Sequence, residues 1–141
     1  MNAVMDVEMP AVVGIADEPD LLRVRTVLRQ HAVSAGFGIV DQTKLVTAGS
    51  ELARNILRYA NGAKADLHVE MVHMGGRTGL RAVFSDQGPG IEDLDAALGD
   101  GYSTGGTLGL GLPGARRLVD EFAIDTAPGA GTRVTITKWQ R

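Results

Sequence analysis

Apolar residues recur along the chain with two different spacings, and these spacings separate the predicted strands from the predicted helices. Residues 11–15 form a short apolar run that is typical of a strand. Two helices are then predicted. The first covers 17–36, where the apolar face is loose, and the second covers about 41–60, where an Asn-Gly pair follows as a terminator.

The remaining strand signals come in two pairs. Residues 66–72 alternate between apolar and polar positions, and 78–84 follow across a loop that contains two glycines, so these segments predict an antiparallel pair. Residues 122–127 and 132–139 are separated by a short Pro- and Gly-containing turn and predict a hairpin at the end of the chain.

Further short helices are predicted at 91–99 and 115–122, on either side of the glycine-rich segment 100–114. Helices are therefore grouped rather than alternating with every strand. This order predicts an α/β (α+β) two-layer sandwich, in which a mixed, largely antiparallel sheet is covered by helices on one face. A chain of 141 residues has the length of one domain, so we expect a single domain over residues 1–141.

Composition and charge narrow the function classes. The chain is 44% hydrophobic and 22% charged, as in an ordinary soluble globular protein. Its net charge of -3 predicts neither a nucleic-acid partner nor a membrane-binding basic patch. The first 20 residues contain no Lys or Arg, unlike the start of a signal peptide, and no apolar run is long enough to span a bilayer. We therefore expect a cytoplasmic location.

The absence of cysteine excludes disulfides, thiol catalysis and cysteine-based zinc sites. The three histidines, His31, His68 and His73, have no short spacing of the kind found in metal-binding motifs. A structural transition-metal site is not expected.

The long helix carries two polar residues beside its apolar face. At about 100° per residue, one stripe faces the core. Its members are Leu45, Ala48, Leu52, Ile56 and Tyr59. Glu51 and Asn55 lie four residues apart at the margin of this stripe, whereas Arg54 is placed roughly opposite it. The pair is either a half-exposed acid and amide on a helix shoulder, or a proton acceptor beside a magnesium ligand. Gly49 indicates close packing against this helix.

Two glycine-rich segments are candidates for contact with a ligand. Residues 109–114 match G-x-G-x-x-G, but they do not directly follow a buried strand, which argues against a dinucleotide-binding unit. The segment is either a surface loop or a set of backbone N–H groups that can bind phosphate. The second segment, 86–90, reads DQGPG and places Asp86 at the end of an apolar strand.

Four segments occur in the order of the motifs of the GHKL ATPase superfamily. They read ELARN (51–55), DQGPGI (86–91), STGGTLGLGLPG (103–114) and GTRVTI (131–136). More closely, the chain resembles the small serine/threonine kinases of bacterial stress-response and anti-sigma modules, of the RsbT type. The resemblance spans roughly residues 34–139 and implies the histidine-kinase-like ATPase fold.

The resemblance also implies a Mg-ATP site between the long helix and the sheet. Glu51 matches the catalytic base, and Asn55 matches the Mg²⁺ ligand. Asp86 matches the acceptor for the adenine amino group, with the Thr132 hydroxyl on the same edge. The resemblance places Gly88 and Gly90 where the backbone approaches ATP. It assigns the lid over the phosphates and the following helix start to Gly109, Gly111 and Gly114.

The implied activity is phosphorylation of a Ser or Thr on a STAS-domain anti-sigma-antagonist or stressosome protein. The resemblance further implies partner switching, with binding to a PP2C-type phosphatase, and leaves a homodimer open. The alternative is an ATP-dependent anti-sigma factor or scaffold with little catalysis. Histidine-kinase, gyrase and MutL assignments need a phosphoacceptor helix or a transducer domain, for which we expect too few residues here.

Overall fold

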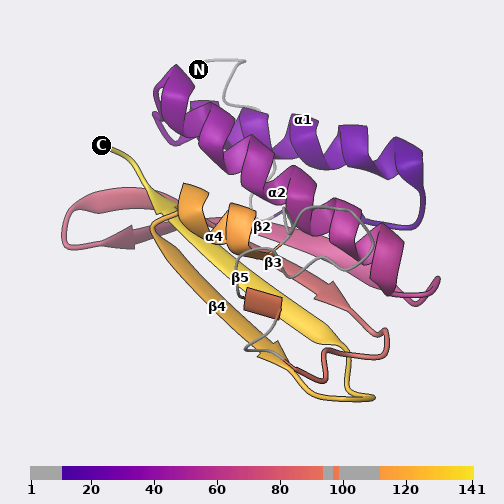
Figure 1. The fold of residues 1–141 in the computed structure, drawn as a ribbon. Coiled ribbons are helices and arrows are strands. Elements are labelled where there is room, and N and C mark those ends of the chain that lie inside the picture. Colours follow the sequence, from indigo (N-terminus) through magenta and orange to yellow (C-terminus); the bar gives the residue numbers. More distant parts are fainter. Residues whose placement is uncertain (1–10, 94–96, 99–111) are drawn as a thin grey trace.

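The computed structural model describes residues 11–93, 97–98 and 112–141, which build a sheet covered on one face by helices (Figure 1). The elements in chain order are β1 (Ala11–Gly14), α1 (Glu18–Ser34), α2 (Ile39–Tyr59), β2 (Ala65–Met74), β3 (Arg77–Asp86), α4 (Leu112–Leu118), β4 (Glu121–Thr126) and β5 (Thr132–Trp139). The five strands lie in the order β1-β2-β3-β5-β4. Every pairing is antiparallel, and the predicted two-layer fold is confirmed.

The core lies between the sheet and the α1–α2 pair. Alternate residues of the central strands point to the helices and are buried, including Leu67 in β2, Phe84 in β3 and Ile136 in β5. Gly49 of α2 permits a close helix contact, because a Cβ there would lie 2.2 Å from Cδ1 of Leu28 in α1. The close packing predicted at Gly49 is therefore present.

Both predicted hairpins are present, and the first is longer than expected. Pairing of β2 with β3 continues to Met74 and Arg77, because Gly75 and Gly76 both adopt positive φ angles, of 58° and 78°, and close a two-residue turn. The final hairpin pairs β4 with β5 in register from Thr126 and Thr132. Residues 86 and 132 thus become direct partners across β3 and β5.

Three local predictions need correction. The helix predicted at 115–122 is instead Leu112–Leu118, because Glu121 and Phe122 pair with β5 and belong to β4. In the helix predicted at 91–99, Ala97 and Leu98 are helical, Ile91 is not, and residues 94–96 and 99 lie outside the described part. Tyr59, predicted in the core, is 55% exposed at the end of α2.

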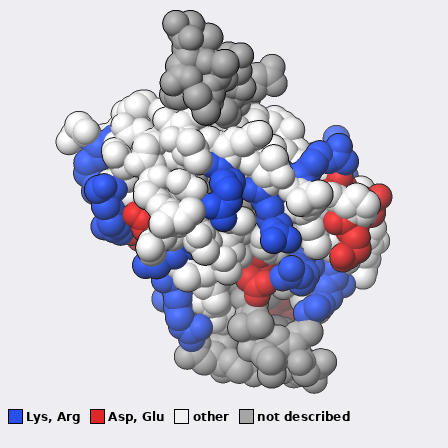
Figure 2. Space-filling view, turned by 90° about the horizontal axis from the view of Figure 1, so that it is seen from above, with Lys and Arg blue, Asp and Glu red and all other residues white. Residues whose placement is uncertain are grey.

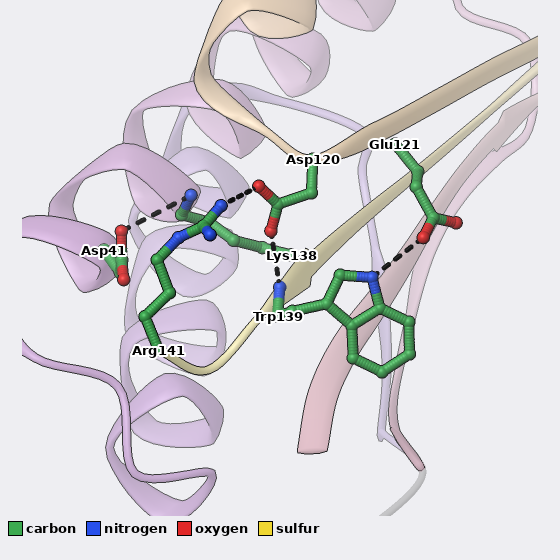
Figure 3. Close-up of polar contacts among 6 residues, drawn as sticks. All are labelled: Asp41, Asp120, Glu121, Lys138, Trp139 and Arg141. Atoms are coloured by element: carbon green, nitrogen blue, oxygen red, sulfur yellow. Dashed lines mark hydrogen bonds and ion pairs between the residues drawn. The ribbon is translucent and has the colours of Figure 1, made fainter. Parts of the chain in front are cut away.

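Polar contacts join the C-terminal end of β5 to its neighbouring elements (Figure 3). Nζ of Lys138 in β5 lies 3.4 Å from Oδ1 of Asp41 in α2. The backbone N–H of Trp139 donates to Oδ2 of Asp120 at 2.7 Å, and its indole N–H donates to Oε2 of Glu121 at 2.8 Å. The end of β5 is therefore fixed to both α2 and the segment that leads from α4 into β4.

Candidate functional site

A cavity of roughly 650 Å³ opens between α2, the ends of β3 and β5, and the start of α4. Glu51 and Asn55 reach it from α2, Asp86 from the end of β3, Thr132 from the start of β5 and Gly90 from the loop after β3. Five residues that the sequence had placed in three separate motifs therefore line one cavity.

The wall of this cavity is mostly apolar where α2 faces the sheet. Leu52 and Ile56 of α2, Phe84 of β3 and Val134 of β5 line it and are buried. An apolar cleft with a few polar groups at its edges is the usual form of a small-molecule site. This wall suits a flat, largely apolar ring, and the polar residues lie where they can orient it.

The acid and the amide of α2 occupy the position that their spacing predicted. Glu51 is half-buried, with 18% of its side chain exposed, and Asn55 lies one turn later on the same wall. The helical wheel placed Arg54 opposite the core, but its long side chain folds back. Nη1 of Arg54 lies 2.5 Å from Oε1 of Glu51. One oxygen of the candidate base therefore carries an ion pair.

Asp86 ends β3 and turns its carboxylate toward the cavity. Oδ1 accepts a hydrogen bond from the Gly88 N–H at 2.9 Å. Burial raises the pKa of Asp86 above its ordinary value, and the Gly88 N–H lowers it in part. No hydrogen bond reaches Oδ2 from the described residues, so this oxygen is positioned to accept one from a ligand.

The two glycines of the turn after β3 are required by neighbouring protein atoms. A Cβ on Gly88 would lie 2.9 Å from Cα of Ala60. Gly90 has a φ of 79°, and a Cβ on it would lie 2.0 Å from the carbonyl oxygen of Ala127. Gly90 lines the cavity, whereas Gly88 packs against the end of α2.

The predicted lid glycines fall mostly outside the described residues. Gly109 and Gly111 lie in the segment that the structure does not describe. Gly114 is the third residue of α4, and among the described residues nothing outside its chain neighbours and its own helix backbone lies within 4 Å of a Cβ built there. Leu112 and Pro113, just before it, line the cavity, so the first turn of α4 forms part of its wall.

Thr126 does not line the cavity, but it contacts Thr132, which does, and the sequence prediction missed it. Its hydroxyl donates to the carbonyl oxygen of Gly131 at 2.9 Å, accepts from the Ile91 N–H at 3.0 Å, and lies 2.9 Å from Oγ1 of Thr132. Thr126 therefore joins the turn after β3 to both strands of the final hairpin. A Thr opposite another Thr across a tight hairpin is the signal that would have indicated it.

Basic side chains also lie at the cavity rim. Arg58 and Tyr59 line the cavity, and the Arg58 guanidinium lies 5.9 Å from the centre of the Tyr59 ring. The helix-covered face of the molecule carries more Lys and Arg than Asp and Glu (Figure 2). Positive side chains are thus concentrated on this side although the net charge of the chain is -3, and such a distribution favours anionic ligands.

Within the described residues, no group of three or more His, Cys, Asp or Glu side chains is arranged to hold a metal ion. The helices among them include none that is both long and apolar enough to cross a membrane.

Comparison with known proteins places this chain in a family. The family model for the histidine kinase-like ATPase domain matches residues 15–138. The chain is 46% identical over 129 residues to the serine/threonine-protein kinase RsbT of Bacillus subtilis (strain 168), across 92% of this chain and 96% of the relative.

More distant comparisons agree with this placement. The anti-sigma F factor of Thermoanaerobacter sp. (strain X514) is 27% identical over 118 residues, which cover 82% of each chain. The mycobacterial sensor histidine kinase MprB shares the fold with a TM-score of 0.58 at 18% identity, over 94% of this chain and 99% of that one. The chain therefore belongs to the histidine kinase-like (GHKL-type) ATPase family and, within it, to the serine/threonine-protein kinases of the RsbT type.

Proposed function

We propose that the chain transfers the γ-phosphoryl group of Mg-ATP to a Ser or Thr hydroxyl of a STAS-domain protein. The observation that carries this proposal is the meeting of Glu51, Asn55, Asp86 and Thr132 in one cavity. Phosphoryl transfer depends mainly on positioning and charge neutralisation. A proton acceptor, a metal ligand and a pair of side chains that recognise adenine therefore form a sufficient set.

Adenine would occupy the apolar wall with its polar edge toward the sheet ends. Asp86 lines the cavity, and the carboxylate oxygen that does not accept from the Gly88 N–H would accept a hydrogen bond from the exocyclic amino group. Thr132 is the direct strand partner of Asp86, so its hydroxyl would act on the same edge. Gly90 lines the cavity beside them and would lie close to the nucleotide.

Magnesium would be held by the amide oxygen of Asn55 together with phosphate and water oxygens. Mg²⁺ favours few protein ligands beside substrate phosphates, and a single amide on the cavity wall fits that requirement. When bound, the ion neutralises phosphate charge. Arg58 at the rim adds a further positive charge, and the glycine-rich segment with Gly109, Gly111 and Gly114 would cover the phosphates.

Glu51 would act as the general base. Its carboxylate takes the proton from the attacking Ser or Thr hydroxyl, whose oxygen then forms the new bond to the γ-phosphorus. The bond between that phosphorus and the bridging oxygen breaks, and ADP leaves with the electron pair. Because Oε1 of Glu51 is paired with Arg54, Oε2 is the oxygen that would receive the proton.

In this proposal residues 1–141 form a single kinase domain that acts in the cytoplasm as a partner-switching regulator of a stress-response or sigma-factor pathway. Partners would be STAS-domain anti-sigma antagonists or stressosome proteins and a PP2C-type phosphatase, and a second copy of the chain is a further candidate. The similarity to anti-sigma F factors supports a second function, an ATP-dependent anti-sigma or scaffold protein with little catalysis.

Incubation with γ-labelled ATP, Mg²⁺ and candidate STAS-domain proteins separates the two functions. Label on a Ser or Thr of the STAS protein supports the kinase. Nucleotide-dependent binding of a partner without transfer of label supports the anti-sigma or scaffold function instead.

A further inference from the structure

The Thr126 hydroxyl has no hydrogen-bonding capacity left for other groups. A hydroxyl oxygen can donate one proton and accept two. Thr126 donates to the Gly131 carbonyl and accepts from the Ile91 N–H, and its remaining contact is the Thr132 hydroxyl at 2.9 Å. The single proton of Thr126 is used on Gly131, so Thr132 must be the donor in the contact between the two hydroxyls.

If the Thr126 hydroxyl donated to Thr132, the buried Gly131 carbonyl would lose its hydrogen bond from Thr126. Losing this hydrogen bond would cost free energy, because Gly131 is buried. Gly131 cannot readily turn away. Its φ is 77°, and a Cβ on it would lie 2.3 Å from the Asp86 carbonyl oxygen, so its backbone is held against β3.

We propose, on the basis of the ATP site above, that Thr126 is a positioning residue that sets the specificity of the site for the nucleobase. With its proton committed to Thr126, the Thr132 hydroxyl offers only lone pairs to the cavity. Its strand partner Asp86 offers a carboxylate oxygen. Both groups at this edge are therefore acceptors.

Because Asp86 and Thr132 both accept hydrogen bonds, they favour a ligand that presents hydrogen-bond donors to them. A 6-aminopurine presents N–H donors to this edge, whereas the oxygen of a 6-oxopurine faces the Asp86 carboxylate and is repelled. A ring nitrogen that accepts can meet Thr132 only through a water molecule that donates to both. The hydroxyl of Thr126 thus maintains the preference for the amino base without touching the ligand.

Calorimetric binding of ADP and IDP, which differ in the 6-amino and 6-oxo groups, tests this role without catalysis. We expect wild type to prefer ADP by about tenfold or more, since a site built for a donor leaves polar groups unpaired with the analogue. Thr126→Val frees the Thr132 proton and should reduce the preference to about threefold or less. Thr126→Ser, which keeps the hydroxyl, should restore it. Thr135→Val on the same hairpin is the matched control and should keep the wild-type ratio.

The outcomes distinguish this inference from the proposed function. An unchanged ADP-to-IDP ratio in a folded Thr126→Val variant would overturn the role of Thr126, even if both affinities fall together. Binding of neither nucleotide by wild type would instead contradict the ATP site itself. Proton NMR of wild type gives a readout that needs no variant. We expect a Thr132 hydroxyl proton that is protected from exchange and close to Thr126, and exchange at the solvent rate would overturn the assignment.

Discussion

Lys138 of β5 and Asp41 of α2 form an ion pair across the two layers of the fold, with 3.4 Å between Nζ and Oδ1. The Lys138 side chain is 3% exposed and that of Asp41 is 16% exposed. By contrast, Arg81 and Glu70 pair on the open face of the sheet with 43% and 49% exposed. The cost of breaking an ion pair depends on this burial.

Asp41→Ala should lower the free energy of unfolding by about 3–5 kcal/mol, because Lys138 is left as a buried charge without its partner. Lys138→Met should cost less, since Asp41 is nearer to water and Met fills similar space. Urea denaturation measures both. Arg81→Ala is the control and should change stability by less than about 1 kcal/mol. Equal losses in Asp41→Ala and Arg81→Ala would show that the buried pair has no special role.

Asp86→Asn should weaken ATP binding without lowering stability at neutral pH. Burial raises the pKa of Asp86 in the folded chain, so the folded state holds a proton more tightly than the unfolded state. Ionised Asp86 therefore opposes folding above its folded pKa, and this cost disappears as pH falls through that value. Asn removes the charge and keeps an oxygen for the Gly88 N–H.

Thermal unfolding across pH checks this assignment. The Asn variant should be at least as stable as wild type at neutral pH, and any advantage should shrink as the medium becomes acidic. A variant that loses stability at neutral pH and binds ATP normally would mean that Asp86 stabilises the fold and does not read the base.

Gly90→Ala should destabilise the chain by roughly 2–4 kcal/mol, because the new Cβ meets the Ala127 carbonyl oxygen and the backbone adopts a positive φ. Gly129 is a matched control. Its φ is 77°, but no atom of the described residues other than its two chain neighbours lies within 4 Å of a Cβ built there. Gly129→Ala should cost only about 1–2 kcal/mol, the penalty of the left-handed conformation. The difference between the two losses of unfolding free energy, measured by urea denaturation, gives the cost of the contact with Ala127. Equal losses in the two variants would show that this contact costs nothing.

Asn55→Ala should remove the magnesium dependence of nucleotide binding. If the amide oxygen is a ligand of the ion, ATP binding by wild type is stronger with Mg²⁺ than with a chelator, and this difference should largely disappear in the variant. Gln30→Ala removes an exposed amide from α1 and should leave the difference intact. A full magnesium effect in Asn55→Ala would exclude this residue as the metal ligand.

The parts of the site that the sequence predicted best are those fixed by local spacing. Glu51 and Asn55 lie together because residues four apart on a helix share one side. The position of Asp86 at a strand end follows from the apolar run before it and the glycines after it. Their approach to Thr132 is not local, because it depends on the pairing of β3 with β5, and only the family resemblance placed these motifs together.

The errors have physical causes as well. Residues 119–122 combine apolar and acidic side chains in an order that fits either a helix end or a strand. Pairing with β5 makes Glu121 and Phe122 part of strand β4. Tyr59 lies on the apolar stripe of α2, but it is the last residue of the helix and lines the open cavity, so it stays exposed. Thr126 gains its three partners only when the final hairpin and the turn after β3 close on each other.

The central claim is that this cavity uses ATP to phosphorylate a protein hydroxyl with Glu51 as the base. Glu51→Gln tests it most directly, because the amide retains an oxygen for Arg54 and changes little else. Transfer from γ-labelled ATP to a STAS-domain partner should fall by about 10²–10⁴-fold in this variant, while ATP affinity stays close to that of wild type. Undiminished labelling of the partner by Glu51→Gln would contradict the account.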